Sequence, residues 1–231
     1  MATTFISERN LRFLLYEVFD IETLLNYPLY ADHSREVFDM VLDTAMKMGH
    51  DLFKPVHSEM DKIPPEYVDG TVKVHPVVRT VMQECGQGGW ISASAPVDLG
   101  GQQMPITMTL APLGIFSAAN YSASVYPFLT SGSANLIVSF GSDDQKYTYL
   151  AKMYSGEWQG TMALTEPQAG SSLSDITTSA EPTKHGFFKI HGQKLFISAG
   201  DHDGADNIIH LVLARIKDAP AGVKGISVER T

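Results

Sequence analysis

No Asp, Glu, Lys or Arg occurs between residues 99 and 142, and this long uncharged stretch limits more than any other feature how the chain can fold. Uncharged stretches of this length are buried, either in a membrane or within the protein. Pro105, Pro112 and Pro127 interrupt it and Asn120 lies in its middle, so it is nowhere continuously apolar for the length of a membrane span. We therefore expect helices that are buried on most sides within a helical layer, and no insertion into a membrane.

Helical periodicity dominates the first two-thirds of the chain. Ser7 and Ser34 can each cap a helix, and after Ser34 apolar residues recur every three or four positions. Ser142, followed by two aspartates in the first turn, starts the last helix, and Gly156 ends it. The helix after Ser34 is expected to end near residue 55, a linker or short strand pair to follow at 62–76, and further helices to lie at 77–84, 106–121 and 131–140.

The period of the sequence changes after Glu157. The runs WQGTMALTE, FFKIHGQKLFISAG and NIIHLVLARI are apolar or alternating, are rich in Ile, Val and Phe, and are bounded by turn residues. These properties are typical of β-strands. The sequence therefore predicts an α+β fold in which a helical part precedes a sheet, with a boundary near residue 157.

Charge and cysteine content argue against several functional classes. The net charge of −9 argues against a nucleic-acid or anionic-membrane partner, because both need clustered Lys and Arg. Cys85 is the only cysteine, so no internal disulfide can form, and no motif around it indicates catalysis. We expect a buried, unreactive thiol. The N-terminal residues lack the features of a signal peptide, which favours a reducing, cytoplasmic location.

Small hydroxyl residues and glycines gather where the predicted strands end. Three such junctions are present, at Thr165–Ser172, Phe196–Gly200 and Ser198–Asp206. They can present backbone N–H groups and hydroxyls to the edge of a flat polar ring, while Gly170 and Ser171 leave room for a phosphate-bearing ligand. The residues alone fit an ordinary sheet with turns equally well, so both interpretations stand at this point.

The third junction is rich in acids. Asp201, His202, Asp203 and Asp206 could hold a divalent metal ion. Acids and glycines at a turn between strands are far more often solvated loop residues. We therefore predict no metal site.

Two of these segments resemble the acyl-CoA dehydrogenases. In that family a T-E-P-x-A-G-S-D segment precedes a K-x-[FW]-I-[ST] strand, and Thr165–Ser171 and Lys194–Ser198 match the two. The pair at this spacing is specific. The segments GWISASAPVDLGGQQMP and FGSDDQKYTYLAKMYSGEWQGTMALTEP extend the resemblance over the chain from about residue 35. Residues 8–32 resemble the N-terminal extension of a larger bacterial subgroup.

The resemblance implies three parts. These are a helical extension at residues 1–35, an N-terminal helical bundle domain at 36–157, and a middle domain at 158–231 of the β-sandwich or barrel type. In the family, the middle domain continues and a C-terminal helical domain follows it. The resemblance therefore implies that this chain is the front part of a longer enzyme, with an incomplete middle domain.

The resemblance also implies FAD as cofactor and assigns roles to five residues. Met162 and Leu164 would contact the flavin through their backbones, and Thr165 would hydrogen-bond the pyrimidine side of the ring. Phe196 would pack against the isoalloxazine, and Ser198 would bond near its O4/N5 edge. These roles place the flavin at the first two junctions.

The substrate side of the implied site follows the same motif. Gly170 and Ser171 would lie beside the CoA portion of a thioester. Two positions depart from the family pattern, since Ser172 stands where Asp is usual and Met162 where an aromatic residue is common. The Asp change would loosen the turn after the motif without overturning the assignment.

The implied reaction is oxidation of an acyl-CoA thioester to the 2,3-enoyl-CoA. A carboxylate base removes the α-proton while the β-hydrogen leaves as hydride to flavin N5. The family's glutamate base lies in the C-terminal domain, so no catalytic residue is expected in this chain and the chain alone is expected to be inactive. Glu166 is the local alternative, and it is expected to serve structure. By the same analogy Leu110, Phe116 and Tyr126 would be walls of the acyl pocket.

The resemblance implies an acyl-CoA substrate, electron-transfer flavoprotein as electron acceptor, and a homo-oligomer at full length. Two alternatives stay open. One is an acyl-CoA oxidase or flavin monooxygenase on the same fold. The other is a catalytically silent CoA- or flavin-binding or interaction module.

Overall fold

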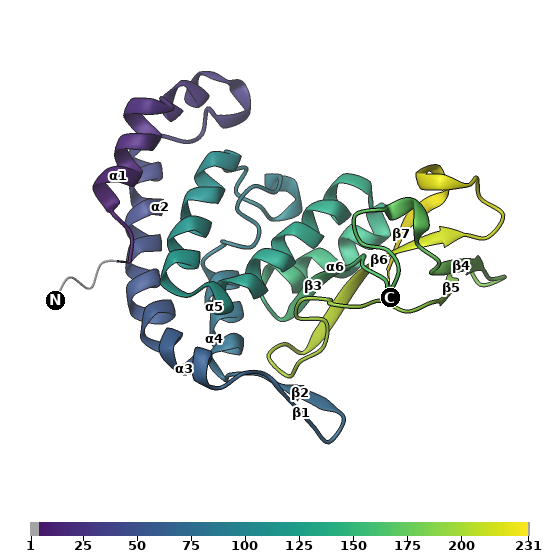
Figure 1. Ribbon diagram of the computed structural model, residues 1–231. Helices are drawn as coiled ribbons and strands as arrows, with labels where there is room; N and C mark the ends of the chain where they lie inside the picture. Colours follow the sequence, from purple (N-terminus) through teal and green to yellow (C-terminus); the bar gives the residue numbers. More distant parts are fainter. Residues whose placement is uncertain (1–4, 231) are drawn as a thin grey trace.

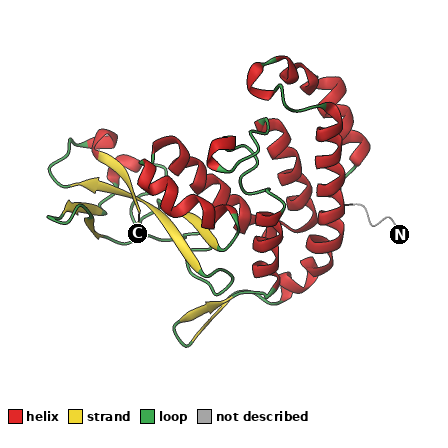
Figure 2. Cartoon of the chain, turned by 180° about the vertical axis from the view of Figure 1, so that it is seen from behind, coloured by secondary structure: helices red, strands yellow, loops and turns green. Residues whose placement is uncertain are grey.

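The computed structural model describes residues 5–230, with helices in one half of the molecule and most of the strands in the other (Figure 1, Figure 2). The α-helices are α1 Glu8–Arg12, α2 Arg35–Met48, α3 His57–Lys62, α4 Val77–Gln87, α5 Ile106–Phe140 and α6 Asp143–Tyr154. The strands are β1 Glu66–Val68, β2 Thr71–Lys73, β3 Trp158–Ala163, β4 Ser179–Pro182, β5 Phe188–His191, β6 Asn207–Ile216 and β7 Ile226–Arg230. Short π- and 3-10-helical segments are Phe13–Val18, Ile21–Asn26, Pro28–Tyr30, Gly49–Phe53, Lys54–Val56, Val97–Leu99, Leu173–Asp175 and Gly222–Gly225. The predicted helix-then-sheet order is confirmed.

The uncharged stretch forms α5, which packs against α2, α4, α6 and β3. Its helical path is broken once, at Asn120, whose φ of −164° and ψ of 96° are not helical. The Asn120 side chain accepts a hydrogen bond from Ala123 N–H at 3.2 Å and donates one to the Phe53 carbonyl at 3.2 Å. Asn120 thus caps the second half of α5, as asparagine does at ordinary helix starts.

The prediction of two separate helices here was wrong about the second one. The first predicted helix ends at the kink, but the second half follows at once and includes Pro127 instead of starting at Ser131. No helix among residues 5–230 combines the length and the apolar character needed to cross a bilayer.

Three predicted caps are present. Ser7, Ser34 and Ser142 accept hydrogen bonds from backbone N–H groups in the first turns of α1, α2 and α6. At α6 the Gln145 side chain also accepts from the Ser142 N–H, which completes a capping box. The predicted end of the second helix near Pro55 was wrong, because helical turns continue to α3. Pro55 lies at the start of a 3-10 turn, where its missing N–H costs little.

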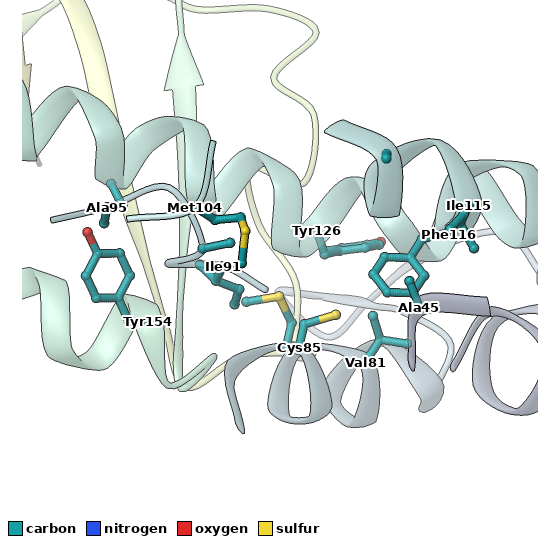
Figure 3. Close-up of a cluster of buried hydrophobic side chains, with 14 of the residues drawn as sticks. Ala45, Val81, Cys85, Ile91, Ala95, Met104, Ile115, Phe116, Tyr126 and Tyr154 are labelled. Carbon is teal, nitrogen blue, oxygen red and sulfur yellow. The ribbon is translucent and has the colours of Figure 1, made fainter. Parts of the chain in front are cut away.

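The helical part has one continuous apolar core. Figure 3 shows side chains of α2, α4 and α5 pointing into a shared interior, among them Ala45, Val81, Cys85, Phe116 and Tyr126. Phe116 is fully buried. Cys85 is also fully buried, and burial raises the pKa of its thiol. The prediction of a buried thiol is confirmed.

The larger sheet is centred on β6. β3 and β4 lie parallel to β6, β5 lies antiparallel to β4, and β7 lies antiparallel to β6. The β3–β6 register runs from Trp158 opposite Asn207 to Ala163 opposite Val212. One face of this pair meets α5, and a Cβ added at Gly160 would lie 2.6 Å from Ser133 Cβ. β4 and β7 are strands that the sequence patterns did not reveal.

Candidate functional site

The segment after β3 is a tight turn. Glu166 N–H donates to the Ala169 carbonyl at 2.7 Å, and Ala169 N–H donates back to the Glu166 carbonyl at 3.2 Å. Pro167 and Gln168 form the tip, and Pro suits this position because its φ is fixed near the required value. The turn sends the chain back past the end of β3.

The buried side chain of Glu166 stabilises this turn through hydrogen bonds. This side chain is 1% exposed. One carboxylate oxygen accepts hydrogen bonds from the Thr177 N–H at 2.7 Å, the Thr177 hydroxyl at 2.9 Å and the Gln168 amide at 2.8 Å. The other accepts from Thr178 N–H at 3.0 Å and from Lys194 Nζ at 2.8 Å. The carboxylate therefore joins three segments that are distant in sequence.

These contacts set the charge state of Glu166. Burial alone would raise its pKa, but hydrogen bonds from Lys194, Thr178 and Thr177 outweigh burial and lower the pKa well below its usual range. A general base needs a pKa near the working pH and access to the proton it removes. Glu166 meets neither requirement, which favours the structural role.

Lys194 and Leu195 connect the second junction to the first. Lys194 Nζ donates to the Leu164 carbonyl at 3.0 Å, and Leu195 N–H donates to the Thr165 carbonyl at 2.9 Å. The two motifs that were singled out in the sequence are therefore neighbours in space. Phe196 follows directly after this junction.

Residues 193–200 are not a strand, so the predicted strand FFKIHGQKLFISAG was wrong beyond His191. Phe196 and Ala199 have left-handed φ values of 57° and 51°, which no strand contains. Phe196 is 90% exposed. No hydrogen bond within residues 5–230 involves the Ser198 or Thr165 hydroxyl. The loop thus presents an aromatic ring and unpaired hydroxyls.

The other predicted site residues lie around this point. Met162 is half-buried on β3 opposite Leu211, and Leu164 packs against a small apolar cluster under the sheet. Gly170 is exposed, and a Cβ added there would meet no atom within 4 Å. Ser171 is exposed beside it. The turn and the loop therefore leave open space at Gly170.

The acidic loop has other roles than holding a metal ion. Asp203 accepts from Val74 N–H at 3.1 Å and pairs with Lys73 at 3.1 Å, and Asp206 pairs with Arg79 at 2.6 Å. These contacts fasten the loop to β2 and α4. Within residues 5–230 no three His, Cys, Asp or Glu side chains are grouped as metal ligands.

The predicted acyl-pocket walls do not line a common space. Leu110 is 53% exposed, whereas Phe116 is buried against Phe53, with ring centroids 4.7 Å apart. Tyr126 packs edge-on against His202 at 5.1 Å. An apolar cleft of about 630 Å³ lies elsewhere, between the ends of α5 and α6 and the sheet. Its lining includes Phe140, Tyr149, Phe187, Leu211 and Val228.

The comparisons with known proteins agree on one family. The family described as "Acyl-CoA dehydrogenase, N-terminal domain" matches residues 37–157. The chain belongs to the acyl-CoA dehydrogenase family.

Individual members of the acyl-CoA dehydrogenase family match more of the chain. The 3-methylmercaptopropionyl-CoA dehydrogenase of Ruegeria pomeroyi is 42% identical over 160 residues, which covers 69% of this chain and 27% of that protein. A butyryl-CoA dehydrogenase of Syntrophomonas wolfei is 37% identical over 227 residues, covering 95% of this chain and 37% of that protein. The chain therefore spans well under half the length of these relatives.

The fold is also that of the solved acyl-CoA dehydrogenases. The crystal structure of an acyl-CoA dehydrogenase complexed with FAD from Bacillus anthracis aligns with a TM-score of 0.69 at 22% identity, covering 87% of this chain and 32% of that one. The predicted family and fold class are both confirmed.

Sequence reasoning missed two interactions at the site. The Glu166–Lys194 pair joins two motifs that were recognised only separately, because pairing across 28 positions leaves no local pattern. The buried contact between His202 and Gln159 was also missed. Gln159 is a polar residue inside the apolar run of β3, and that was the available signal.

Proposed function

We propose that this chain forms the helical and flavin-contacting parts of an FAD-dependent dehydrogenase that oxidises an acyl-CoA thioester to the 2,3-enoyl-CoA. The observation that carries the proposal is the hydrogen bond from Leu195 N–H to the Thr165 carbonyl. It brings the two family motifs together and leaves the Thr165 and Ser198 hydroxyls unpaired beside an exposed Phe196.

The chemistry of these groups fits FAD. An isoalloxazine ring has apolar faces and a polar pyrimidine edge. The exposed Phe196 ring offers a surface for one face, and the Thr165 and Ser198 hydroxyls offer hydrogen bonds to the edge. Met162 and Leu164 would add backbone contacts from β3 and its extension. The solved acyl-CoA dehydrogenase of Bacillus anthracis is complexed with FAD, which supports this choice of cofactor.

When bound, FAD supplies the acceptor for the hydride that leaves the β-carbon of the substrate. The residues of this chain bind and orient. Gly170 and Ser171 would border the CoA portion, where the open space at Gly170 admits a bulky ligand. Glu166 keeps the turn in shape and is not the base. We assign α-proton removal to a glutamate of the family's C-terminal helical domain.

The proposal extends to organisation and partners. We assign residues 1–35 to a helical extension, 36–157 to the N-terminal helical domain and 158–231 to the middle domain. The whole enzyme would form a homo-oligomer and pass its electrons to an electron-transfer flavoprotein. The names of the Ruegeria pomeroyi and Syntrophomonas wolfei relatives, both acyl-CoA dehydrogenases, support the reaction class.

The test uses the protein expressed from its complete gene. It should purify with FAD, and acyl-CoA thioesters of several chain lengths should bleach the visible flavin absorption without rapid oxygen uptake. The 231-residue chain alone, mixed with FAD and the same thioesters, should show no bleaching. Rapid oxygen uptake would favour an oxidase or monooxygenase, and a complete protein that binds FAD or CoA without bleaching would favour a silent binding module.

A further inference from the structure

The loop Phe196–Gly200 has an unusual backbone conformation, which requires stabilising contacts. Phe196 and Ala199 both adopt left-handed φ, which non-glycine residues rarely do and which costs energy. Within the loop, Gly200 N–H donates to the Ile197 carbonyl at 3.1 Å. One short hydrogen-bonded turn does not stabilise two left-handed residues, so contacts from outside the loop are needed.

One external contact is a series of hydrogen bonds through three buried residues, Gly204, His202 and Gln159. Gly204 N–H donates to His202 Nδ1 at 3.0 Å, so Nδ1 is an acceptor and carries no proton. The ring proton is therefore on Nε2, which donates to Gln159 Oε1. This contact turns the Gln159 amide so that its NH₂ group faces and donates to the Ala199 carbonyl at 3.4 Å. The order of donors and acceptors is fixed from Gly204 through to Ala199.

Burial shields this series of hydrogen bonds from water. Gln159 is fully buried and His202 is 5% exposed, with the Tyr126 ring edge-on to the imidazole. Burial lowers the pKa of His202, and the neighbouring Asp203 and Asp201 carboxylates offset only part of that effect. A neutral imidazole is what the arrangement requires, because protonation of Nδ1 would break the contact with Gly204.

The two ends of the loop are thereby fixed to β3 and to the segment that follows it. Ala199 is bonded to Gln159 inside β3, and Leu195 is bonded to Thr165, which follows β3 after Leu164. Phe196 and Ser198 lie between these two anchors. Because β3 also leads into Thr165, the groups assigned to the flavin share one rigid support.

We propose that His202 and Gln159 are positioning residues, which hold the Phe196–Ala199 backbone in the shape that receives the flavin ring. This inference rests on the proposed function. Neither residue touches the ring, since both act through the Ala199 carbonyl. Such positioning matters because a planar ligand binds best to groups that are already held in the right geometry.

Two substitutions at His202 separate its two hydrogen bonds. In His202→Asn the side-chain oxygen can still accept from Gly204, but it does not reach Gln159. In His202→Gln the amide can reach Gln159, while the acceptor for Gly204 is lost. Amide hydrogen exchange in the protein from the complete gene should therefore show opposite patterns. Gly200 should exchange about fivefold faster in the Asn variant only, and Gly204 about fivefold faster in the Gln variant only.

FAD affinity gives the second measurement. His202→Asn should weaken FAD binding about fivefold, as expected for one lost hydrogen bond, and His202→Gln should stay close to the wild type. Gln159→Met, which removes both contacts without removing the side-chain bulk, should behave like His202→Asn. His210→Asn is the matched control, since His210 lies on β6 opposite Thr161 and makes no hydrogen bond to the loop.

The possible failures can be told apart. A wild-type protein that binds no FAD contradicts the proposed function, and the Gly200 exchange then decides alone whether His202 shapes the loop. Unchanged Gly200 exchange and unchanged FAD affinity in both His202→Asn and Gln159→Met would overturn the inference. If one of these two variants fails to fold, the other decides.

Discussion

The helical and sheet regions of this molecule are held together by different kinds of contact. The core of the helical region is one large cluster of buried apolar side chains, and it even includes Ile209 and Leu211 from β6. Beyond that shared face, the sheet region has a separate buried cluster of only Ala169, Ile176 and Leu213. Beyond the face that it shares with the helices, the apolar core of the sheet region is therefore small.

Outside the apolar core, buried polar contacts connect the segments of the sheet region. Glu166 and Lys194 pair between the turn at Glu166–Ala169 and the loop Phe196–Gly200, and both side chains are largely buried, at 1% and 11% exposed. This is also where the candidate flavin contacts lie. The comparison indicates that the candidate site lies in a region whose shape depends on a few directed hydrogen bonds, whereas the helical region depends on apolar packing.

The largest expected effect tests the helical core. Phe116→Ala removes a fully buried ring that stacks on Phe53 and meets Trp90 edge-on, so we expect a loss of about 4 kcal/mol in the free energy of unfolding. Leu213→Ala in the small cluster should cost about 2 kcal/mol, because a shallow site collapses more easily. Urea unfolding measures both, and an equal loss at the two positions would contradict the comparison.

The next effect tests the polar part. Glu166→Gln leaves Lys194 buried without a counter-charge, so we expect a loss of about 3 kcal/mol at neutral pH. Glu181→Gln is the matched control, because its pair with Lys217 is about half exposed and should contribute little to stability. Similar losses for the two variants would show that the Glu166 pair is not special.

The cost of Glu166→Gln should also depend on pH. A carboxyl whose pKa is lower in the folded than in the unfolded protein stabilises fully above its unfolded value, about 4.3 for Glu. That contribution is lost as the pH falls through the folded value. The stability difference between wild type and Glu166→Gln should therefore be greatest near pH 7 and shrink steadily below about pH 4. A difference that grows on acidification would refute the assignment.

A smaller effect concerns the helix that precedes the sheet. Ser142→Ala removes both the oxygen that accepts from Gln145 N–H and the reciprocal capping box, so we expect a loss of about 1 kcal/mol. Ser142→Gly should cost only about a few tenths of a kcal/mol, since glycine is tolerated at this position. Thermal unfolding of the two variants distinguishes a cap from a mere surface residue.

Local signals were read correctly from the sequence, and long-range ones were not. The sequence identifies Ser142 as a helix cap because its partner lies three residues away, and it identifies the two family motifs by their residue patterns. The residues around Phe196 are β-formers and predict a strand, whereas the structure has a loop there. Contacts from Gln159 and Thr165, which are distant in the chain, help to hold it in a left-handed shape.

Helix boundaries show the same limit. Asn120 marks a kink because its side chain reaches the Phe53 carbonyl, 67 positions away. Phe116 and Tyr126 were predicted to line an acyl pocket by analogy, yet the packing directs them into the core and against His202. A residue's place on a helix could be predicted, but the direction of its side chain depended on partners that the sequence does not reveal.

The smallest effect on stability should come from the site itself. The Thr165 hydroxyl has no hydrogen-bond partner within residues 5–230, so Thr165→Val should change the free energy of unfolding by less than about 0.5 kcal/mol. The same substitution should weaken FAD binding by about 1 kcal/mol, because the hydroxyl's proposed partner is the flavin edge. Thr161→Val is the control, since its hydroxyl is buried and equally unpaired on β3 but is assigned no flavin contact. Thr161→Val should leave FAD binding unchanged. Stability measured without FAD and affinity measured by flavin titration separate the two roles. If Thr165→Val destabilised the protein yet bound FAD normally, Thr165 would belong with the polar support beside Glu166, and the line between the support and the site would have to be redrawn.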